Sequence, residues 1–135
     1  MRQTEQTDVA LVVEDQEHIA YLLQHMLSRE GFRVEVAPDG RKAAEYISTE
    51  EAPKVVLMDV MLPYLDGFEL TKLIRAHPAW KLVPVIILSE HSQEDDVVRA
   101  LDSGANDFVS KPYRPRELLA RISRRVSEAE DLAGL

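Results

Sequence analysis

Three short runs of apolar residues, rich in β-branched side chains, constrain the fold of this chain more than any other feature. They lie at Val9–Val13, Val55–Met58 and Val83–Leu88. Each run is too short for a helix, and none alternates polar with apolar residues as a half-exposed strand does. Continuous apolar runs of this length are typical of strands buried on both faces of a parallel sheet. The chain is therefore predicted to fold around such a sheet.

Segments with helical periodicity lie between the predicted strands. Two weaker strand candidates, Arg33–Ala37 and Asp107–Ser110, bring the expected number of strands to five. Apolar residues at helical spacing predict helices near 19–27, 43–47, 70–74, 97–105 and 115–126, with Gly31 and Gly104 at C-terminal caps and Pro115 in a first turn. Strict alternation of strands and helices implies right-handed crossovers and a doubly wound α/β fold with helices on both faces of the sheet.

Length and composition indicate one globular domain. The 135 residues are predicted to form a single domain, 1–135, with a core of about 8–126 and frayed polar tails. The formal net charge of −8 argues against direct nucleic-acid binding, because backbone phosphates are bound by clustered Lys and Arg. The absence of Cys excludes disulfides and thiolate metal sites. No signal-peptide or membrane-span pattern is present, so a reducing cytoplasm is the expected location.

The polar residues at the ends of the predicted strands are the candidates for chemistry, because ligands of open α/β sheets bind beyond the C-terminal strand ends. Those ends carry three acids, a hydroxyl and an ammonium, namely Glu14, Asp15, Asp59, Ser89 and Lys111. Taken singly, each has an ordinary explanation as a helix cap, a turn former or a surface charge. Because polar residues occur at all of these strand ends, a shared site is the stronger interpretation.

Three carboxylates gathered at one edge require a cation, since like charges raise one another's pKa values when nothing neutralises them. Oxygen ligands favour a hard cation, and Mg²⁺ binds one or two carboxylates while leaving room for phosphate oxygens. Lys111 would then attract an incoming phosphoryl group, Ser89 would supply a hydrogen bond, and Asp59 would be the nucleophile. The pattern predicts a Mg²⁺-dependent phosphoryl-handling site.

The same segments resemble the receiver domain family of two-component signalling, the CheY-like response regulators. The matching segments are VVEDQEHI at 12–19, VVLMDVMLPYLDGFEL at 55–70, PVIILSE at 84–90 and GANDFVSKPYRPRELLARI at 104–122. The resemblance implies a flavodoxin-like sheet of five strands in the order 2-1-3-4-5, with five helices. It also implies phosphorylation of Asp59 by a sensor histidine kinase or a phosphotransfer protein, and control of a downstream protein or effector domain.

The resemblance also implies roles for individual residues. Glu14 and Asp15 look like the acidic pair that holds Mg²⁺, for which Mn²⁺ can substitute. The Met61 backbone carbonyl looks like a further metal ligand. Ser89 and Phe108 look like the switch pair of the family, in which the hydroxyl moves toward the phosphoryl group and the aromatic ring turns inward.

The C-terminal segment is most similar to receivers of winged-helix regulators, in which the fourth helix, fifth strand and fifth helix form a dimer face. Asp107 and Arg121 match one ion pair of that face, so a phosphorylation-dependent homodimer is a further expectation. Val97 and Asn106 depart from the pattern, which has a basic and an acidic residue there. The Lys111–Pro112 bond is expected to be cis, as is common in the family.

Three other classes of protein remain as alternatives. A flavodoxin-like cofactor binder needs a loop rich in Gly, Ser and Thr after the first strand, where this chain has the acidic segment 14–17. A haloacid dehalogenase-like phosphatase needs an acid where Met61 stands, so a signalling phosphoprotein is expected rather than a turnover enzyme. A receiver that acts as an interaction module without phosphorylation stays open, and Glu90, directly after Ser89, is its support in the sequence.

Overall fold

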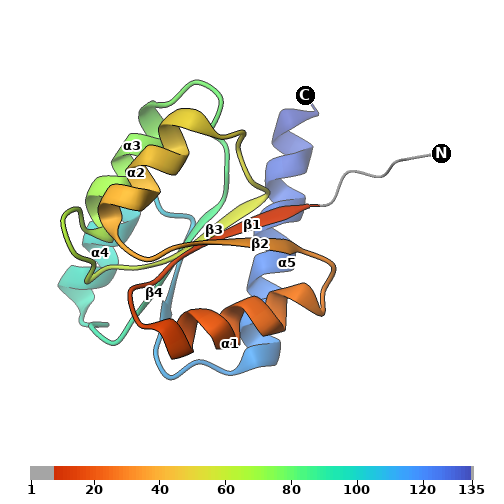
Figure 1. Cartoon of the computed structure of the whole chain (residues 1–135). Helices are drawn as coiled ribbons and strands as arrows, with labels where there is room; N and C mark the ends of the chain where they lie inside the picture. Colours follow the sequence, from red (N-terminus) through yellow and green to blue (C-terminus); the bar gives the residue numbers. More distant parts are fainter. Residues whose placement is uncertain (1–7, 135) are drawn as a thin grey trace.

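The structure, a computed structural model that describes residues 8–134, alternates five strands with five helices. Their bounds are β1 (Val9–Val13), α1 (Glu17–Ser28), β2 (Arg33–Ala37), α2 (Gly40–Thr49), β3 (Val55–Asp59), α3 (Gly67–Ala76), β4 (Val85–Ser89), α4 (Glu94–Asp102), β5 (Asp107–Ser110) and α5 (Pro115–Ala133). The strands pair in parallel in the order β2-β1-β3-β4-β5 (Figure 1). The predicted fold class and strand order are confirmed.

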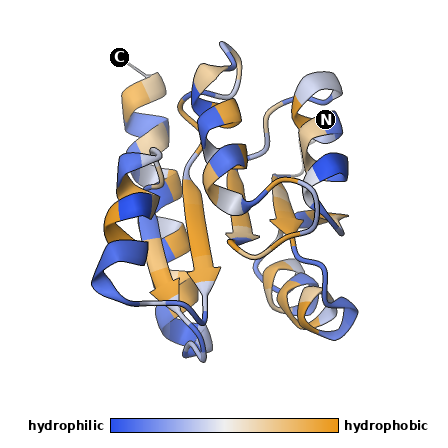
Figure 2. Ribbon diagram, turned by 90° about the vertical axis from the view of Figure 1, so that its left-hand side faces the viewer, coloured by the Kyte–Doolittle hydropathy of each residue, from blue (hydrophilic) through white to orange (hydrophobic). Residues whose placement is uncertain are grey.

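Helices cover both faces of the sheet, which explains the uninterrupted apolar runs. Helices α1 and α5 lie on one face, and α2, α3 and α4 lie on the other (Figure 1). The three central strands β1, β3 and β4 are almost entirely buried, and the arrows of the sheet are drawn largely in the hydrophobic colour (Figure 2). Because side chains alternate between the faces of a strand, each central strand contributes to two separate apolar cores.

Several boundaries differ from the sequence prediction. Helix α4 ends at Asp102 rather than near residue 105, and the C-cap of α1 is Arg29 rather than Gly31. Strand β4 begins at Val85 rather than at Val83, since Pro84 has no N–H to donate to a neighbouring strand. Val83 instead closes a turn in which its N–H donates to the carbonyl of Trp80. The Trp80 side chain is fully buried, and its indole N–H donates to the carbonyl of Glu50 at 3.2 Å.

The expectation of a frayed tail after residue 126 is wrong for residues 127–133, which continue α5. An ion pair between Lys54 and Glu130, with Nζ 2.9 Å from Oε2, joins this last part of the helix to the loop before β3. The predicted tail residues 1–7 and 135 lie outside the described residues. Within residues 8–134, no helix combines the length and the hydropathy that crossing a membrane requires.

Truncation of a side chain in the central strand should show how strongly the sheet depends on two-sided burial. Leu57 in β3 is completely buried, so Leu57→Ala should lower the free energy of unfolding by about 2–5 kcal/mol in urea titrations. The same truncation at Leu82, which is 50% exposed, is the matched control and should cost less than about 1 kcal/mol. Equal losses at the two sites would contradict this description of the core.

Candidate functional site

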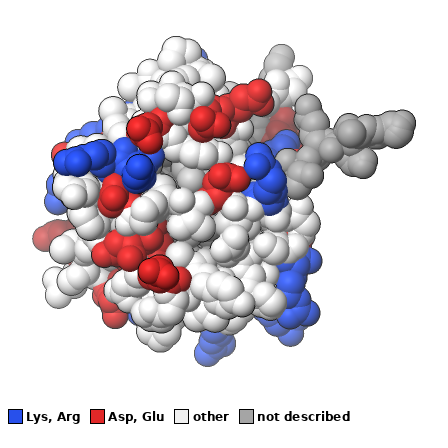
Figure 3. Space-filling model, viewed as in Figure 1, with Lys and Arg blue, Asp and Glu red and all other residues white. Residues whose placement is uncertain are grey.

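The carboxyl ends of β1 and β3 bring the three predicted acids together. Because Val13 of β1 pairs with Met58 of β3, the next residues, Glu14 and Asp59, emerge side by side. One carboxylate oxygen each from Glu14, Asp15 and Asp59 lies within 4.8 Å of the others. Acidic side chains gather on the left of the molecular face, over this end of the sheet (Figure 3).

The ammonium of Lys111 lies between two of these acids. Its Nζ is 3.0 Å from Oδ2 of Asp59 and 3.2 Å from Oε1 of Glu14. All three side chains are largely enclosed, with exposed fractions of 11% for Lys111, 12% for Asp59 and 2% for Glu14. Burial alone would lower the pKa of Lys111, but the hydrogen bonds and charges of Asp59 and Glu14 outweigh burial and raise that pKa. Lys111 therefore stays protonated at neutral pH.

Backbone donors orient the carboxylates of Glu14 and Asp59. The N–H of Gln16 donates to Oε2 of Glu14 at 3.2 Å, and the N–H of Met61 donates to Oδ1 of Asp59 at 3.1 Å. Burial raises the pKa of Glu14, and the nearby charge of Asp59 adds to this effect, although the Gln16 and Lys111 contacts oppose it. Burial thus makes ionisation of Glu14 less favourable in the protein than in water.

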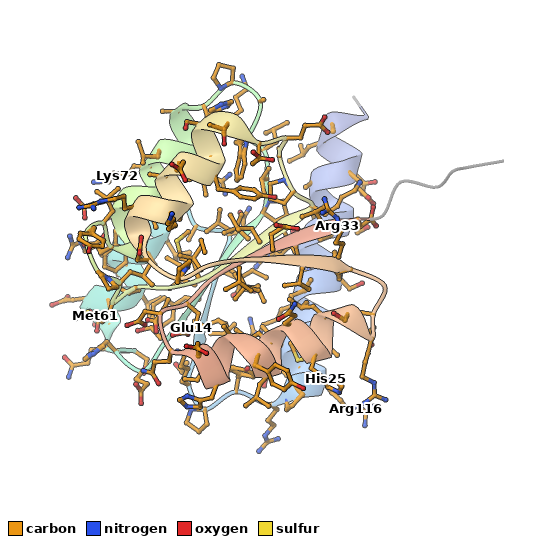
Figure 4. All side chains as sticks on the ribbon, in the orientation of Figure 1. Glu14, His25, Arg33, Met61, Lys72 and Arg116 are labelled. Carbon is orange, nitrogen blue, oxygen red and sulfur yellow. The ribbon has the colours of Figure 1, made fainter. Side chains whose placement is uncertain are left out.

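Met61 lies in the loop that follows β3, at the same end of the sheet as Glu14, whereas Arg33 lies toward the opposite end (Figure 4). The Met61 side chain is exposed, so the part of this residue that can serve the site is its backbone. The structure thus places the residue predicted to supply a carbonyl ligand next to the acid cluster.

Ser89 is the last residue of β4, the strand beside β3, and is fully buried. Its Oγ accepts a hydrogen bond from the N–H of His91 at 3.0 Å, and its carbonyl accepts the N–H of Lys111 at 2.9 Å. The second contact places Lys111 at the end of the neighbouring strand β5. The Lys111–Pro112 peptide bond is cis, as expected.

Phe108, the other predicted switch residue, is half-buried in β5 and pairs in register with Ile87 of β4. Its ring packs against the apolar core under α2, α3 and α4. Ser89 and Phe108 therefore stand on adjacent strands. Their movement as a pair remains a prediction.

The predicted dimer ion pair is formed within the single chain. The Arg121 guanidinium donates to both carboxylate oxygens of Asp107, at 3.1 and 3.2 Å, and Arg125 donates to the same carboxylate at 3.4 Å. Asn106, which departs from the pattern of winged-helix regulators, accepts hydrogen bonds through Oδ1 from Arg75 and from the N–H of Val85. A role of Asp107 and Arg121 between two copies stays a prediction.

Two glycines to which the sequence pattern assigned no role, Gly40 and Gly67, help to shape the site. A Cβ at Gly67 would lie 2.6 Å from the carbonyl oxygen of Asp59, and a Cβ at Gly40 would lie 2.1 Å from that of Leu65. Both close approaches hold the loop after β3 against the start of a helix. Each glycine follows an Asp that caps its helix. In the sequence, an Asp-Gly pair just before an apolar helical stripe could have identified both positions.

Comparison with known proteins agrees with this geometry. The family model described as response regulator receiver domain matches residues 10–123. The chain is 40% identical over 120 residues to the alkaline phosphatase synthesis transcriptional regulatory protein PhoP of Bacillus subtilis, covering 89% of this chain and 49% of that protein. It is 42% identical to the transcriptional regulatory protein GltR of Pseudomonas aeruginosa, with coverage of 89% and 49%. The chain thus spans about half the length of these curated relatives.

Solved receiver domains have the same fold. The receiver domain of a signal transduction histidine kinase from Syntrophus aciditrophicus superposes with a TM-score of 0.82 at 34% identity, covering 90% of this chain and 91% of that one. The receiver domain of the sensor histidine kinase PA1611 from Pseudomonas aeruginosa, which has a magnesium ion coordinated in its active-site cleft, gives 0.82 at 31% identity and covers 90% and 99%. With the strand order and the acid cluster, these matches show that the chain belongs to the response regulator receiver domain family of two-component systems.

Proposed function

We propose that this receiver domain accepts a phosphoryl group on Asp59 in a Mg²⁺-dependent reaction and thereby controls a partner protein or an effector domain. A sensor histidine kinase or a phosphotransfer protein is the donor. The observation that carries the proposal is the position of Lys111, whose ammonium contacts Asp59 beside two further acids. This arrangement combines a nucleophilic carboxylate, a fixed positive charge and a set of oxygen ligands.

The residues present fit a hard divalent cation. Three carboxylates face one ammonium, so negative charge is in excess at an edge where Glu14 is buried. Glu14, Asp15 and Asp59 would hold Mg²⁺, with the Met61 carbonyl as a further ligand, and Mn²⁺ would substitute because it also accepts oxygen ligands. When bound, Mg²⁺ supplies positive charge that offsets the negative charge of the transferred phosphoryl oxygens.

Each group of the site would have a separate role in phosphoryl transfer. The N–H of Met61 holds Oδ1 of Asp59, and Lys111 contacts Oδ2, so the nucleophile has a fixed orientation. A bond forms between a carboxylate oxygen of Asp59 and the phosphorus, while the bond from the phosphorus to the donor's nitrogen breaks. Ser89 already accepts a hydrogen bond from His91, which leaves its own O–H free to donate to a phosphoryl oxygen.

Phosphorylation would act on the α4, β5 and α5 side of the molecule through Ser89 and Phe108. A phosphoryl group adds about −1.5 to −2 charges at neutral pH, and movement of Ser89 toward it would open space for the Phe108 ring. Helix α4 is suited to respond because Ala100 is the one residue that the described structure buries on it. The Asp107–Arg121 pair lies on the same side and would be available to a phosphorylation-dependent homodimer.

The site also favours a signalling phosphoprotein over a turnover enzyme and over a receiver that works without phosphorylation. No acid stands at position 61, where a phosphatase of the haloacid dehalogenase type would carry its general acid. The contacts that orient Asp59 fit a phosphorylated module, because they give a carboxylate a fixed direction beside a positive charge. We infer that the output depends on the phosphorylated state.

The proposal predicts a single phosphoryl adduct. Incubation with Mg²⁺ and a small phosphodonor should add one phosphoryl group to the wild-type protein, as detected by intact-mass spectrometry. Asp59→Asn should remove the adduct because the amide is a poor nucleophile, and a chelator should abolish it in the wild-type protein. Asp102→Asn, at the exposed end of α4, removes the same charge and should keep the adduct. An adduct that persists in Asp59→Asn would disprove the assignment.

The raised pKa of Glu14 predicts that ionisation of this residue lowers the stability of the metal-free protein, by an amount that depends on pH. As pH rises above 4.5, the unfolded chain releases this proton before the folded protein does, so the contribution of Glu14 to stability falls with rising pH. In the presence of a chelator, Glu14→Gln should therefore be more stable than the wild type at pH 7, and the difference should shrink toward pH 4. Urea titrations across this range measure both trends.

The exposed Glu17→Gln is the control for the Glu14 titration, since it removes the same charge from the next helix and should show no comparable trend. A Glu14→Gln protein that is less stable than the wild type at pH 7 would mean that Lys111 fully offsets the burial of the carboxylate. Saturating Mg²⁺ should stabilise the wild type more than Glu14→Gln, because the amide is a weaker ligand.

A further inference from the structure

The loop between β3 and α3, residues 60–66, contains a strained turn at Tyr64. Within residues 8–134, Tyr64 is the one non-glycine residue with a positive φ, at 75°. The N–H of Leu65 donates to the carbonyl of Pro63 at 3.0 Å, which closes a three-residue turn around Tyr64. Turns of this kind are rare and strained for residues with a side chain, whereas glycine adopts them freely. The tyrosine must therefore be held there by another contact.

That contact comes from the first turn of α2. The guanidinium carbon of Arg41 lies 3.9 Å from the centroid of the Tyr64 ring, which is the geometry of a cation–π interaction. The Tyr64 side chain is 66% exposed, so burial does little to hold it. Beside Arg41, the N–H of Gly40 donates to the carbonyl of Pro63 at 3.0 Å. Two successive residues of α2 thus fasten the loop at its most strained point.

The loop that Gly40 and Arg41 contact is also the segment that contacts Asp59. Just before Tyr64, the N–H of Leu62 donates to the carbonyl of Val60 at 3.1 Å, so a second three-residue turn surrounds Met61. Met61 in turn donates its N–H to Asp59. The two turns follow one another without a flexible spacer, so a change in the turn at Tyr64 would alter the direction of the Met61 N–H and carbonyl.

We propose that Arg41 is a positioning residue for the phosphoryl site. Its guanidinium holds Tyr64 in the strained turn and so fixes the Met61 backbone toward Asp59 and the bound cation. This inference rests on the proposed function, because the position of the Met61 carbonyl matters only where a divalent cation binds. Arg41 itself touches neither the cation nor the phosphoryl group in this account.

Electrostatics and positioning predict opposite effects of removing Arg41. The chain carries a formal net charge of −8, so loss of a positive charge should by itself strengthen Mg²⁺ binding. Loss of positioning should weaken it. We expect Arg41→Ala to weaken Mg²⁺ binding roughly two- to fivefold, the range that corresponds to an exposed cation–π contact.

Two further variants distinguish an effect of the Tyr64 turn on Mg²⁺ binding from an effect of charge alone. Tyr64→Gly relieves the strain directly and should bind Mg²⁺ nearly as the wild type does, and Arg41→Ala should cause no further weakening in that background. Arg33→Ala removes the same charge toward the opposite end of the sheet and should not weaken binding. Binding is measured by calorimetric titration with Mg²⁺ alone.

Amide hydrogen exchange in the metal-free protein gives a second readout. The Leu65 and Gly40 amides should exchange faster in Arg41→Ala than in the wild type, because both donate to the carbonyl of Pro63. If the wild type binds no Mg²⁺, the proposed function fails, and the exchange rates still decide whether Arg41 holds the loop. Unchanged exchange of these amides overturns the inference. Tighter Mg²⁺ binding in Arg41→Ala, matching Arg33→Ala, also overturns it.

Discussion

The contact of the Lys111 ammonium with Glu14 and Asp59 is the interaction on which the other features of the site depend. The parallel sheet brings these side chains together because its strands end at one edge. These three side chains are largely enclosed there. Three acids against one ammonium remain unbalanced in charge, which makes the metal-free site unfavourable and receptive to a cation. The parallel pairing of the strands thus determines both the fold and the charge of the site.

Most of the fold was predictable because its central elements depend on local pattern. Strands buried on both faces require unbroken apolar runs, so Val55–Met58 was recognisable as a strand without any knowledge of its neighbours. Pro115 begins α5 as its fixed φ allows. The site was predictable for a related reason, since Glu14 and Lys111 stand at strand ends that parallel pairing brings to one edge. The role of Met61 came from family resemblance alone.

Features that depend on long-range contacts were not predictable. Leu22 belongs to the apolar stripe of α1 but is exposed, because the sheet covers only part of the helix surface. Asn106 looked like a missing partner in a dimer face, yet its amide oxygen accepts from Arg75. The positive φ of Tyr64 and the continuation of α5 past residue 126 likewise coincide with contacts to residues distant in sequence, Arg41 and Lys54 respectively.

The most direct test of the account is a crystal structure of the protein grown with Mn²⁺, with anomalous diffraction used to locate the metal. We predict one strong anomalous peak at the edge of the sheet, within about 2.0–2.3 Å of oxygens from Asp15, Asp59 and the Met61 carbonyl, and close to Glu14. Lys111 should remain beside Asp59. An absent peak, or a peak bound by other residues while these acids stay apart from it, would contradict the claim that this edge is a divalent-cation site.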